Sequence, residues 1–328
     1  MFLVKNKINK FSKKHIKPLR IVIGGGSLGL FFSHRISIEY PNSDLFIISK
    51  SIPDKTILIE DSNKCKSQFN FKNFIDSNKI NKIQKKFNHK LIIFYICLPP
   101  EEVNASIDYI KQINKYNQFS AKNVIVFFNN GVINYHLFSS SFSKNEYFII
   151  RSIVISGFMR IENENNILVK NTSGRIFYYG YYGKKNNLLK NILPKKYFEF
   201  KYSKSIFKLE KAKFLTNLLL GLFINKRLLT NKEIFPLVKP ATLDEIFYNY
   251  SILFKDKKIT PHFLKYYFNQ AIKQTESNIN SISYAWYHGN TKPIEYFLAK
   301  LQELSYLSNN SKAKNFFEKL ISLKNSSN

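Results

Sequence analysis

The stretch RIVIGGGSLGLFF, from Arg20 to Phe32, decides the fold. A short β-branched run leads into three consecutive glycines, a fourth glycine follows three residues later, and an apolar segment comes next. Residues 19–23 have the pattern of a buried strand, and apolar side chains recur at near-helical spacing over residues 28–38. The stretch therefore predicts a strand, a glycine-rich turn and a helix.

The rest of the first half repeats this alternation. DLFIISK (44–50) and KLIIFYICLPP (90–100) predict two more buried strands, a helix is expected through 101–113, and NVIVFF predicts a fourth strand that ends at Asn129. Strands that alternate with helices pair in parallel through right-handed crossovers. We expect an α/β fold with a Rossmann-type, doubly wound parallel sheet.

The second half changes character after Ser203. Before it, EYFIIRSIVIS, NNILVKN and GRIFYYGYYG predict three strands in hairpin succession that extend the sheet or add an edge to it. After it, a long helical pattern over 205–229 is followed by helical periodicity over 243–254, 261–278 and 293–307. We predict a disordered basic lead-in over 1–18, a cofactor-binding domain over 19–203 and an all-helical domain over 204–328.

The formal net charge of +29 raises the question of a polyanionic partner. Only six of the 51 basic residues are arginines, whereas phosphate and base recognition favours the planar guanidinium. Ile, Asn, Lys, Phe and Tyr are enriched together, which is typical of an A+T-rich genome. We interpret the charge as a solvated lysine surface and expect no specific nucleic-acid partner, with polyanion binding as the alternative.

Other compositional signals restrict the class of protein. No apolar run approaches the ~20 residues of a membrane span, so we expect no membrane partner. Cys65 and Cys97 form no CxxC pair, and the histidines form no metal-binding cluster, so neither disulfides nor a metal site is expected. Residues 1–18 lack the features of a secretory signal, with an organelle transit segment as the alternative to a disordered lead-in. A reducing cytoplasm fits these features.

In GGGSLG, Gly24, Gly26 and Gly29 occupy the positions of a G-x-G-x-x-G motif. In such a motif the first glycine permits the tight turn, the second lets the backbone approach a pyrophosphate, and the third lets the helix pack closely on the strand. The helix N-terminus then favours the anion, which places Ser27 and Leu28 beside the cofactor as well. We predict a dinucleotide site.

The end of the second predicted strand indicates which dinucleotide is bound. NAD sites usually place an acidic residue there for the ribose 2′-hydroxyl, whereas this strand ends in Ser49 and Lys50. A hydroxyl and an ammonium suit a 2′-phosphate, so we predict NADPH with Lys50 as a ligand. The alternative is that Lys50 is one of many surface lysines.

Three further stretches, in this order and spacing, resemble the ketopantoate reductase (2-dehydropantoate 2-reductase) family. They are FFNNG at the end of the fourth strand, KFLTN at the start of the helical half, and NINS followed by PIEY. The resemblance spans residues 20–318. It implies a Rossmann domain followed by a helical domain, with the substrate in the cleft between them.

The resemblance also assigns roles to single residues. Lys213 matches the catalytic lysine, which protonates the oxygen of a 2-oxo acid while NADPH delivers hydride to the carbonyl carbon. Asn130 matches the asparagine at the junction of cofactor and substrate, and Ser281 matches the serine that binds the substrate carboxylate. Asn217 lies one helical turn after Lys213 and is expected to share its face. Each of these residues also has an ordinary alternative, such as a surface lysine or a turn asparagine.

The chain departs from the family pattern at several positions. The family glutamate falls on Pro293, the second helical asparagine on Gly221, and the cofactor-contacting lysine on Pro99; the aromatic residue before the catalytic lysine is Lys211. We expect Glu295, two residues past Pro293, to supply the missing carboxylate if the preceding loop shifts the register.

Together these features predict an NADPH-dependent reductase of a small-molecule 2-oxo acid, with ketopantoate as the first candidate substrate and pantoate synthesis as the process. We expect a cytoplasmic monomer or homodimer. A diverged enzyme for another small 2-oxo acid, and an impaired Rossmann protein that binds polyanions, are the alternatives.

Overall fold

The structure is a computed structural model that describes residues 18–51, 53–82, 89–117, 122–142, 147–182, 192–223, 228–254 and 256–325. The predicted lead-in over 1–18 lies outside these ranges except for Pro18.

The buried apolar runs of the first half form one sheet. β1 (Leu19–Ile23) pairs in parallel with β2 (Asp44–Ser49) on one side and with β6 (Leu91–Ile96) on the other. β7 (Lys122–Phe127) continues the parallel series beside β6, and β8 (Tyr147–Glu162) follows beside β7. Every residue of β1 is buried, as in a strand that is covered on both faces. The predicted parallel sheet is confirmed.

The sheet extends further than the sequence predicts. Its order is β4-β3-β9-β8-β7-β6-β1-β2-β5, and β10 pairs with β9. The strands that the sequence does not predict are β3 (Thr56–Glu60), β4 (Lys66–Gln68), β5 (Phe74–Asp76) and β10 (Glu199–Tyr202), whereas β9 (Asn166–Tyr182) covers two segments that it does predict as strands. The prediction of three short strands after residue 146 is wrong, because the second and third of them form the single long strand β9, antiparallel to β8.

Helices cover both faces of the sheet. α1 (Ser27–Glu39) packs Phe31 and Phe32 against one face, and α2 (Ser106–Lys115) and α3 (Tyr135–Ser141) pack against the other. The 3₁₀ turns η3 (Ser77–Lys82) and η4 (Pro100–Ala105) precede β6 and α2. The fold is doubly wound, as predicted.

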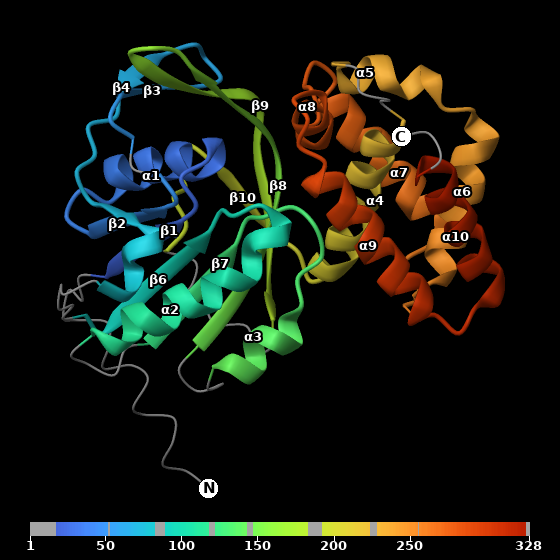
Figure 1. Ribbon diagram of the computed structural model, residues 1–328, viewed down its shortest axis with the longest axis horizontal. Helices are drawn as coiled ribbons and strands as arrows, with labels where there is room; N and C mark the ends of the chain where they lie inside the picture. Colours follow the sequence, from blue (N-terminus) through green and yellow to red (C-terminus); the bar gives the residue numbers. More distant parts are fainter. Residues whose placement is uncertain are drawn as a thin grey trace, which may run out of the picture.

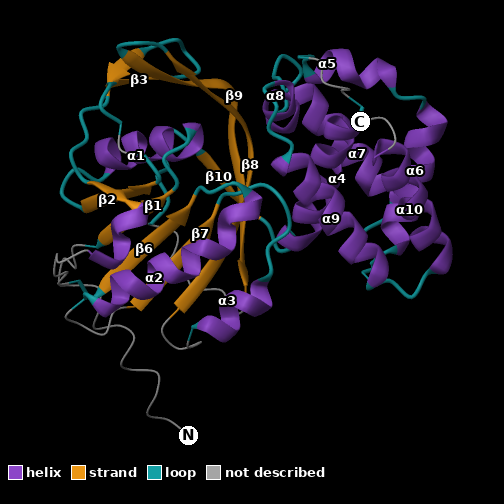
Figure 2. Cartoon of the chain, in the orientation of Figure 1, coloured by secondary structure: helices purple, strands orange, loops and turns teal. Residues whose placement is uncertain are grey.

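The chain beyond β10 is helical, and Figure 2 shows these helices gathered beside the sheet. They are α4 (Ile206–Leu222), α5 (Asn231–Ile234), the 3₁₀ turn η6 (Phe235–Leu237), α6 (Pro240–Ile252), α7 (Pro261–Gln274), α8 (Ser281–Tyr287), α9 (Lys292–Tyr306) and α10 (Ser311–Asn325). α4 is buried along most of its length and contacts α7, α8 and α9 as well as β8 and β9. The helix expected over 205–229 ends earlier, at Leu222; residues 224–227 lie outside the description.

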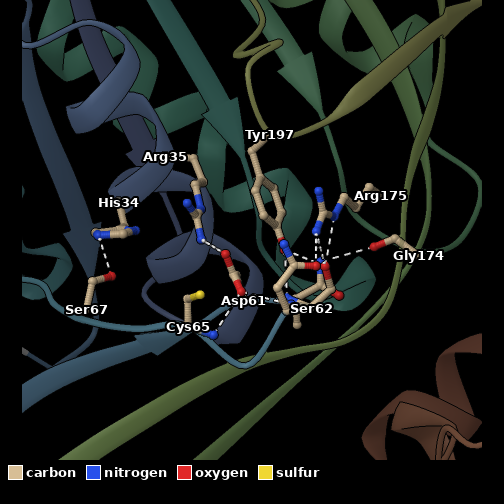
Figure 3. A network of polar contacts seen from close by, with 11 residues as sticks. His34, Arg35, Asp61, Ser62, Cys65, Ser67, Gly174, Arg175 and Tyr197 are labelled. Atoms are coloured by element: carbon tan, nitrogen blue, oxygen red, sulfur yellow. Dashed lines mark hydrogen bonds and ion pairs between the residues drawn. The ribbon is translucent and has the colours of Figure 1, made fainter.

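The outer parts of β8 and β9, with β3 and β4, form an arch above α1 (Figure 1). A polar network fixes this arch to the helix (Figure 3). The Tyr197 ring lies between the guanidinium groups of Arg35, at 4.0 Å, and Arg175, at 4.6 Å. Arg35 also pairs with Asp61 at 3.5 Å, and Arg175 donates to the Ser62 hydroxyl. The arch is therefore held in place over the N-terminal helix.

Two kinds of feature are absent from the residues that the structure describes. None of their helices combines the length and apolarity that a membrane span requires. They also contain no group of three histidine, cysteine or acidic side chains placed to hold a metal ion.

Candidate active site

A cleft of about 340 Å³ opens at the carboxyl ends of the parallel strands, where the sheet meets the helices of the second half. The segments that follow β1, β6 and β7 line it, together with the middle of β8 and residues of α4, α7, α8 and α9. Ligands of open α/β sheets bind at this edge. Six of the predicted site residues line the cleft: Ser27, Leu28, Asn130, Lys213, Asn217 and Ser281.

The three glycines of the loop after β1 meet three different environments. Gly24 has φ +117°, and a Cβ there would lie 2.7 Å from the Cys97 carbonyl oxygen. A Cβ on Gly29 would lie 1.8 Å from the Gly24 carbonyl oxygen, so the helix packs on the loop as the motif predicts. A Cβ on Gly26 would meet nothing within 4 Å. Gly26 therefore faces open space, which a pyrophosphate could approach.

The tip of β2 carries no carboxylate. Ser49 is buried, and its hydroxyl oxygen lies 2.3 Å from the position of a Cβ on Gly25. The Lys50 side chain is 65% exposed and pairs with Glu102 of η4. Lys50 therefore lies at the tip of β2 but outside the residues that line the cleft, and its charge is paired with Glu102.

Lys213 and Asn217 occupy one face of α4, one turn apart, as predicted from their spacing. Lys213 is half-buried, and the described residues include no carboxylate paired with its ammonium group. Burial in the cleft wall, and then the positive charge of Arg151, lower the pKa of Lys213 to about 8. A proton on Lys213 is thus more easily donated than on an ordinary lysine.

A buried ion pair, which the sequence reasoning missed, connects this helix to the sheet. Arg151 Nε donates to Glu210 Oε1 at 2.5 Å, and both side chains are 2% exposed. Arg151 Nη2 also donates to the carbonyl oxygens of Asn129, at 2.9 Å, and Gly131, at 3.0 Å. The pair therefore holds both α4 and the loop that carries Asn130. The signal in the sequence was an isolated arginine in an apolar strand and a glutamate in an apolar helix.

The two remaining predicted site residues, Ser281 and Glu295, differ in their position relative to the cleft. Ser281 begins α8 at the cleft, after an N-cap at Asn280. Glu295 does not lie at the cleft; it is exposed on α9, while Pro293 lines the cleft at the start of that helix. The expected register shift is therefore wrong, because α9 begins at Lys292 and turns Glu295 outward.

The cleft does contain one carboxylate that sequence reasoning missed. Glu101 of η4 lines it, and the Oε2 atom of Glu101 is buried without a hydrogen-bond partner among the described residues. A buried acceptor without a partner is costly unless a ligand donates to it. Glu101 and Pro99 together give this wall a character different from the basic one expected of the family.

The fold and the site together define a class: a Rossmann-type sheet with a glycine-rich loop, joined to a helical unit whose first helix presents a lysine to the shared cleft. The sequence matches no known protein-family model, and no curated protein matches it.

Several solved structures are similar to this chain in fold. A probable 2-dehydropantoate 2-reductase of Bacillus subtilis is 16% identical, with a TM-score of 0.66 over 94% of this chain and 100% of that one. The 2-dehydropantoate 2-reductase of Geobacter metallireducens is 11% identical, with a TM-score of 0.68 over 94% and 100%. A D-mandelate dehydrogenase, solved with NADH and anilino(oxo)acetate, is 12% identical, with a TM-score of 0.67 over 94% and 99%. The chain thus has the fold of the ketopantoate reductases.

Proposed function

We propose that this protein reduces a 2-oxo acid with NADPH, and that ketopantoate, which becomes pantoate, is its first candidate substrate. The observation that carries the proposal is the position of Lys213. Its ammonium group has no carboxylate partner among the described residues and lines the same cleft as Ser27, Leu28 and Asn130. The fold is also that of reductases and dehydrogenases whose solved structures include a complex with NADH.

The loop after β1 fits a dinucleotide. Gly26 leaves open space at the N-terminus of α1, where backbone N–H groups and the helix dipole favour a pyrophosphate. Gly24, Gly26, Ser27, Leu28 and Gly29 would hold it. When a reduced nicotinamide dinucleotide is bound, the chemistry it supplies is hydride for the carbonyl carbon.

In this proposal Lys213 is the general acid. Its ammonium group stabilises the negative charge that develops on the carbonyl oxygen and then transfers a proton to that oxygen, which leaves Lys213 neutral and the product a hydroxy acid. Burial strengthens this electrostatic effect, because water competes less for the charge. Lys213 recovers its proton from solvent after product release.

Neutral polar groups orient the substrate around Lys213. Asn130, Asn217 and Ser281 line the cleft and are assigned to the substrate, with Asn130 also at the cofactor. Because the Pro293 side chain offers no hydrogen-bond acceptor, we assign to Glu101, a carboxylate that lines the cleft, the role of accepting a hydrogen bond from a substrate hydroxyl. An enzyme for another small 2-oxo acid is the second form of the same proposal.

The proposal also covers the roles of the two halves of the chain, the location of the protein and its oligomeric state. Residues 19–203 bind the cofactor and residues 204–328 complete the substrate site, in a cytoplasmic enzyme without a specific nucleic-acid or membrane partner. We expect a monomer or homodimer; a ketopantoate reductase of Staphylococcus aureus, 11% identical with a TM-score of 0.64 over 94% of this chain and 98% of that one, is described as dimeric.

The test follows NADPH consumption with ketopantoate and with a panel of other small 2-oxo acids. Lys213→Ala should lower kcat/KM by about 10²- to 10⁴-fold, the usual contribution of a positioned acid. Lys211→Ala is the matched control, since Lys211 lies on the same helix but stacks on Phe254 at 4.2 Å, outside the cleft lining. No turnover of any 2-oxo acid by the folded wild type, or equal rates in the two variants, would overturn the proposal.

A further inference from the structure

Arg160 lies beside the glycine loop, although it comes from a distant strand. It belongs to β8 and pairs with Val169 of β9, which pairs in turn with Ile59 of β3. These segments form the arch above α1 (Figure 1). The Nη1 atom of Arg160 donates to the Gly25 carbonyl oxygen at 3.2 Å, across 135 residues of sequence. Its side chain is only 29% exposed. A guanidinium is therefore fixed at the loop where an anionic cofactor is expected.

Gly25 connects Arg160 to the tip of β2. Its carbonyl oxygen accepts from Arg160, while the position of its absent Cβ lies 2.3 Å from the Ser49 hydroxyl oxygen. In a Rossmann site the ribose 2′ position lies at the tip of the second strand. Arg160 therefore stands next to the place where NADPH and NADH differ.

Lys50, the cation at the tip of β2, is less well placed for that task. It pairs with Glu102, and its side chain is 65% exposed, so solvent screens its charge. A guanidinium held over the loop offers several N–H donors in a planar arrangement that suits phosphate oxygens.

We propose that Arg160 binds the 2′-phosphate of NADPH and so sets the preference of this protein for NADPH over NADH. The proposal rests on the proposed function, since it requires a dinucleotide on the glycine loop. It assigns cofactor specificity to the arch, rather than to the strand tip alone.

Glu162 is an ion-pair partner of Arg160 and so affects how readily Arg160 can bind a phosphate. Arg160 Nη2 donates to Glu162 Oε2 at 2.8 Å, and Lys55 Nζ donates to Glu162 Oε1 at 3.1 Å. Hydrogen bonds from Lys55 and then from Arg160 lower the pKa of Glu162, so it stays ionised near neutrality. Lys55 can keep Glu162 paired when Arg160 turns to a phosphate. Glu162 therefore competes with the cofactor for Arg160 without being left unpaired.

The experiment measures dissociation constants by calorimetry, without turnover, for NADPH, NADH, 2′-AMP and 5′-AMP. In Arg160→Gln the affinity for NADPH and 2′-AMP should fall about ten- to a hundredfold, as for a lost charge-assisted contact, and the affinity for NADH and 5′-AMP should change less than about threefold. Arg160→Lys should keep part of the preference. Glu162→Gln should bind NADPH more tightly, because it removes the competitor.

Lys170→Gln is the matched control, because it removes a cation of the same arch that pairs with Glu60 at 3.4 Å, not with the loop, and that takes no part in the network of Arg35, Tyr197 and Arg175. Its preference for NADPH should equal that of the wild type. Equal weakening of NADPH and NADH in Arg160→Gln, or no weakening, would overturn the assignment of the 2′-phosphate. A wild type that binds neither dinucleotide would instead overturn the proposed function.

Discussion

At the scale of single residues, the proton on Lys213 controls the proposed reaction. Burial and Arg151 lower the pKa of Lys213 to about 8, and only the protonated form can donate. With the proposed acid role, kcat/KM should be level below about pH 7 and fall roughly tenfold for each pH unit above the pKa. A pH profile checks this. The same falling limb in Lys213→Ala would show that another group titrates.

Variants of Gly26 and Gly29 should distinguish an effect on cofactor binding from an effect on folding. A Cβ on Gly26 enters open space, and its φ of −74° suits any residue, so Gly26→Val should keep the melting temperature within a few degrees. The side chain would nevertheless occupy the approach to the loop and abolish binding of NADPH and NADH alike. Calorimetric titration of both cofactors measures this.

Gly29→Val should behave in the opposite order, because its Cβ would lie 1.8 Å from the Gly24 carbonyl oxygen and the strand-to-helix turn would have to open. We expect a strongly lowered melting temperature or no folded protein. Normal cofactor affinity in Gly26→Val would mean that the pyrophosphate lies elsewhere.

At the scale of elements, the Arg151–Glu210 pair joins β8 to α4 in the interior. Removing one partner leaves a buried charge uncompensated, so Arg151→Met should lower the free energy of unfolding by about 3–5 kcal/mol. The double variant Arg151→Met with Glu210→Leu should regain most of that loss, since apolar residues of similar volume often replace a buried pair without cost. Urea unfolding of the two single variants and the double variant tests the coupling.

A double variant as unstable as the sum of the two single variants would show that the pair is not coupled. Activity gives a second, independent readout, because Arg151 also binds the carbonyl oxygens around Asn130. The double variant should fold but turn over slowly.

Elements also show where prediction from the sequence succeeds. β1 and β6 are continuous apolar runs between turn signals, and local sequence suffices for such strands. The long strand β9 was predicted as two strands because its centre contains Ser173 and Gly174, which resemble a turn. Pairing with β8 on both sides of an irregularity at Gly157 and Ser173, and with β3 and β10 over its two ends, keeps it continuous. Such pairing is tertiary and leaves no local pattern.

The same limit applies to the site. The order and spacing of the motifs suffice to predict that Lys213, Asn130 and Ser281 share one cleft. The strand ends and the first helix of the second half fix the positions of these residues. The contact between Arg160 and Gly25 spans 135 residues, and no sequence period encodes it. The Glu295 expectation failed because one residue of uncertainty in a loop turns a helical side chain by about 100°.

At the scale of the whole molecule, the described arginines make their contacts with other groups of the protein. Arg20 is buried against Tyr95 and Tyr40, Arg151 is buried with Glu210, and Arg160 lies at the glycine loop. Arg35 and Arg175 stack on Tyr197. Arg227 lies outside the described residues. The guanidinium groups that best read phosphates and bases are thus engaged within the protein, and most of the +29 charge belongs to lysines.

This distribution predicts how the protein meets nucleic acid. A charge of +29 should give weak retention on a DNA duplex at low salt, since counterion release favours any basic surface. Since the five described arginines all make contacts within the fold, that affinity should be independent of sequence and fall by about 10³-fold or more between roughly 50 and 200 mM salt. Fluorescence anisotropy with two unrelated duplexes across a salt series measures both properties. Binding that stays tight at physiological salt, or that prefers one duplex, would show that the lysine surface is an evolved nucleic-acid site, and would favour the polyanion alternative over an enzyme with a diffusely basic exterior.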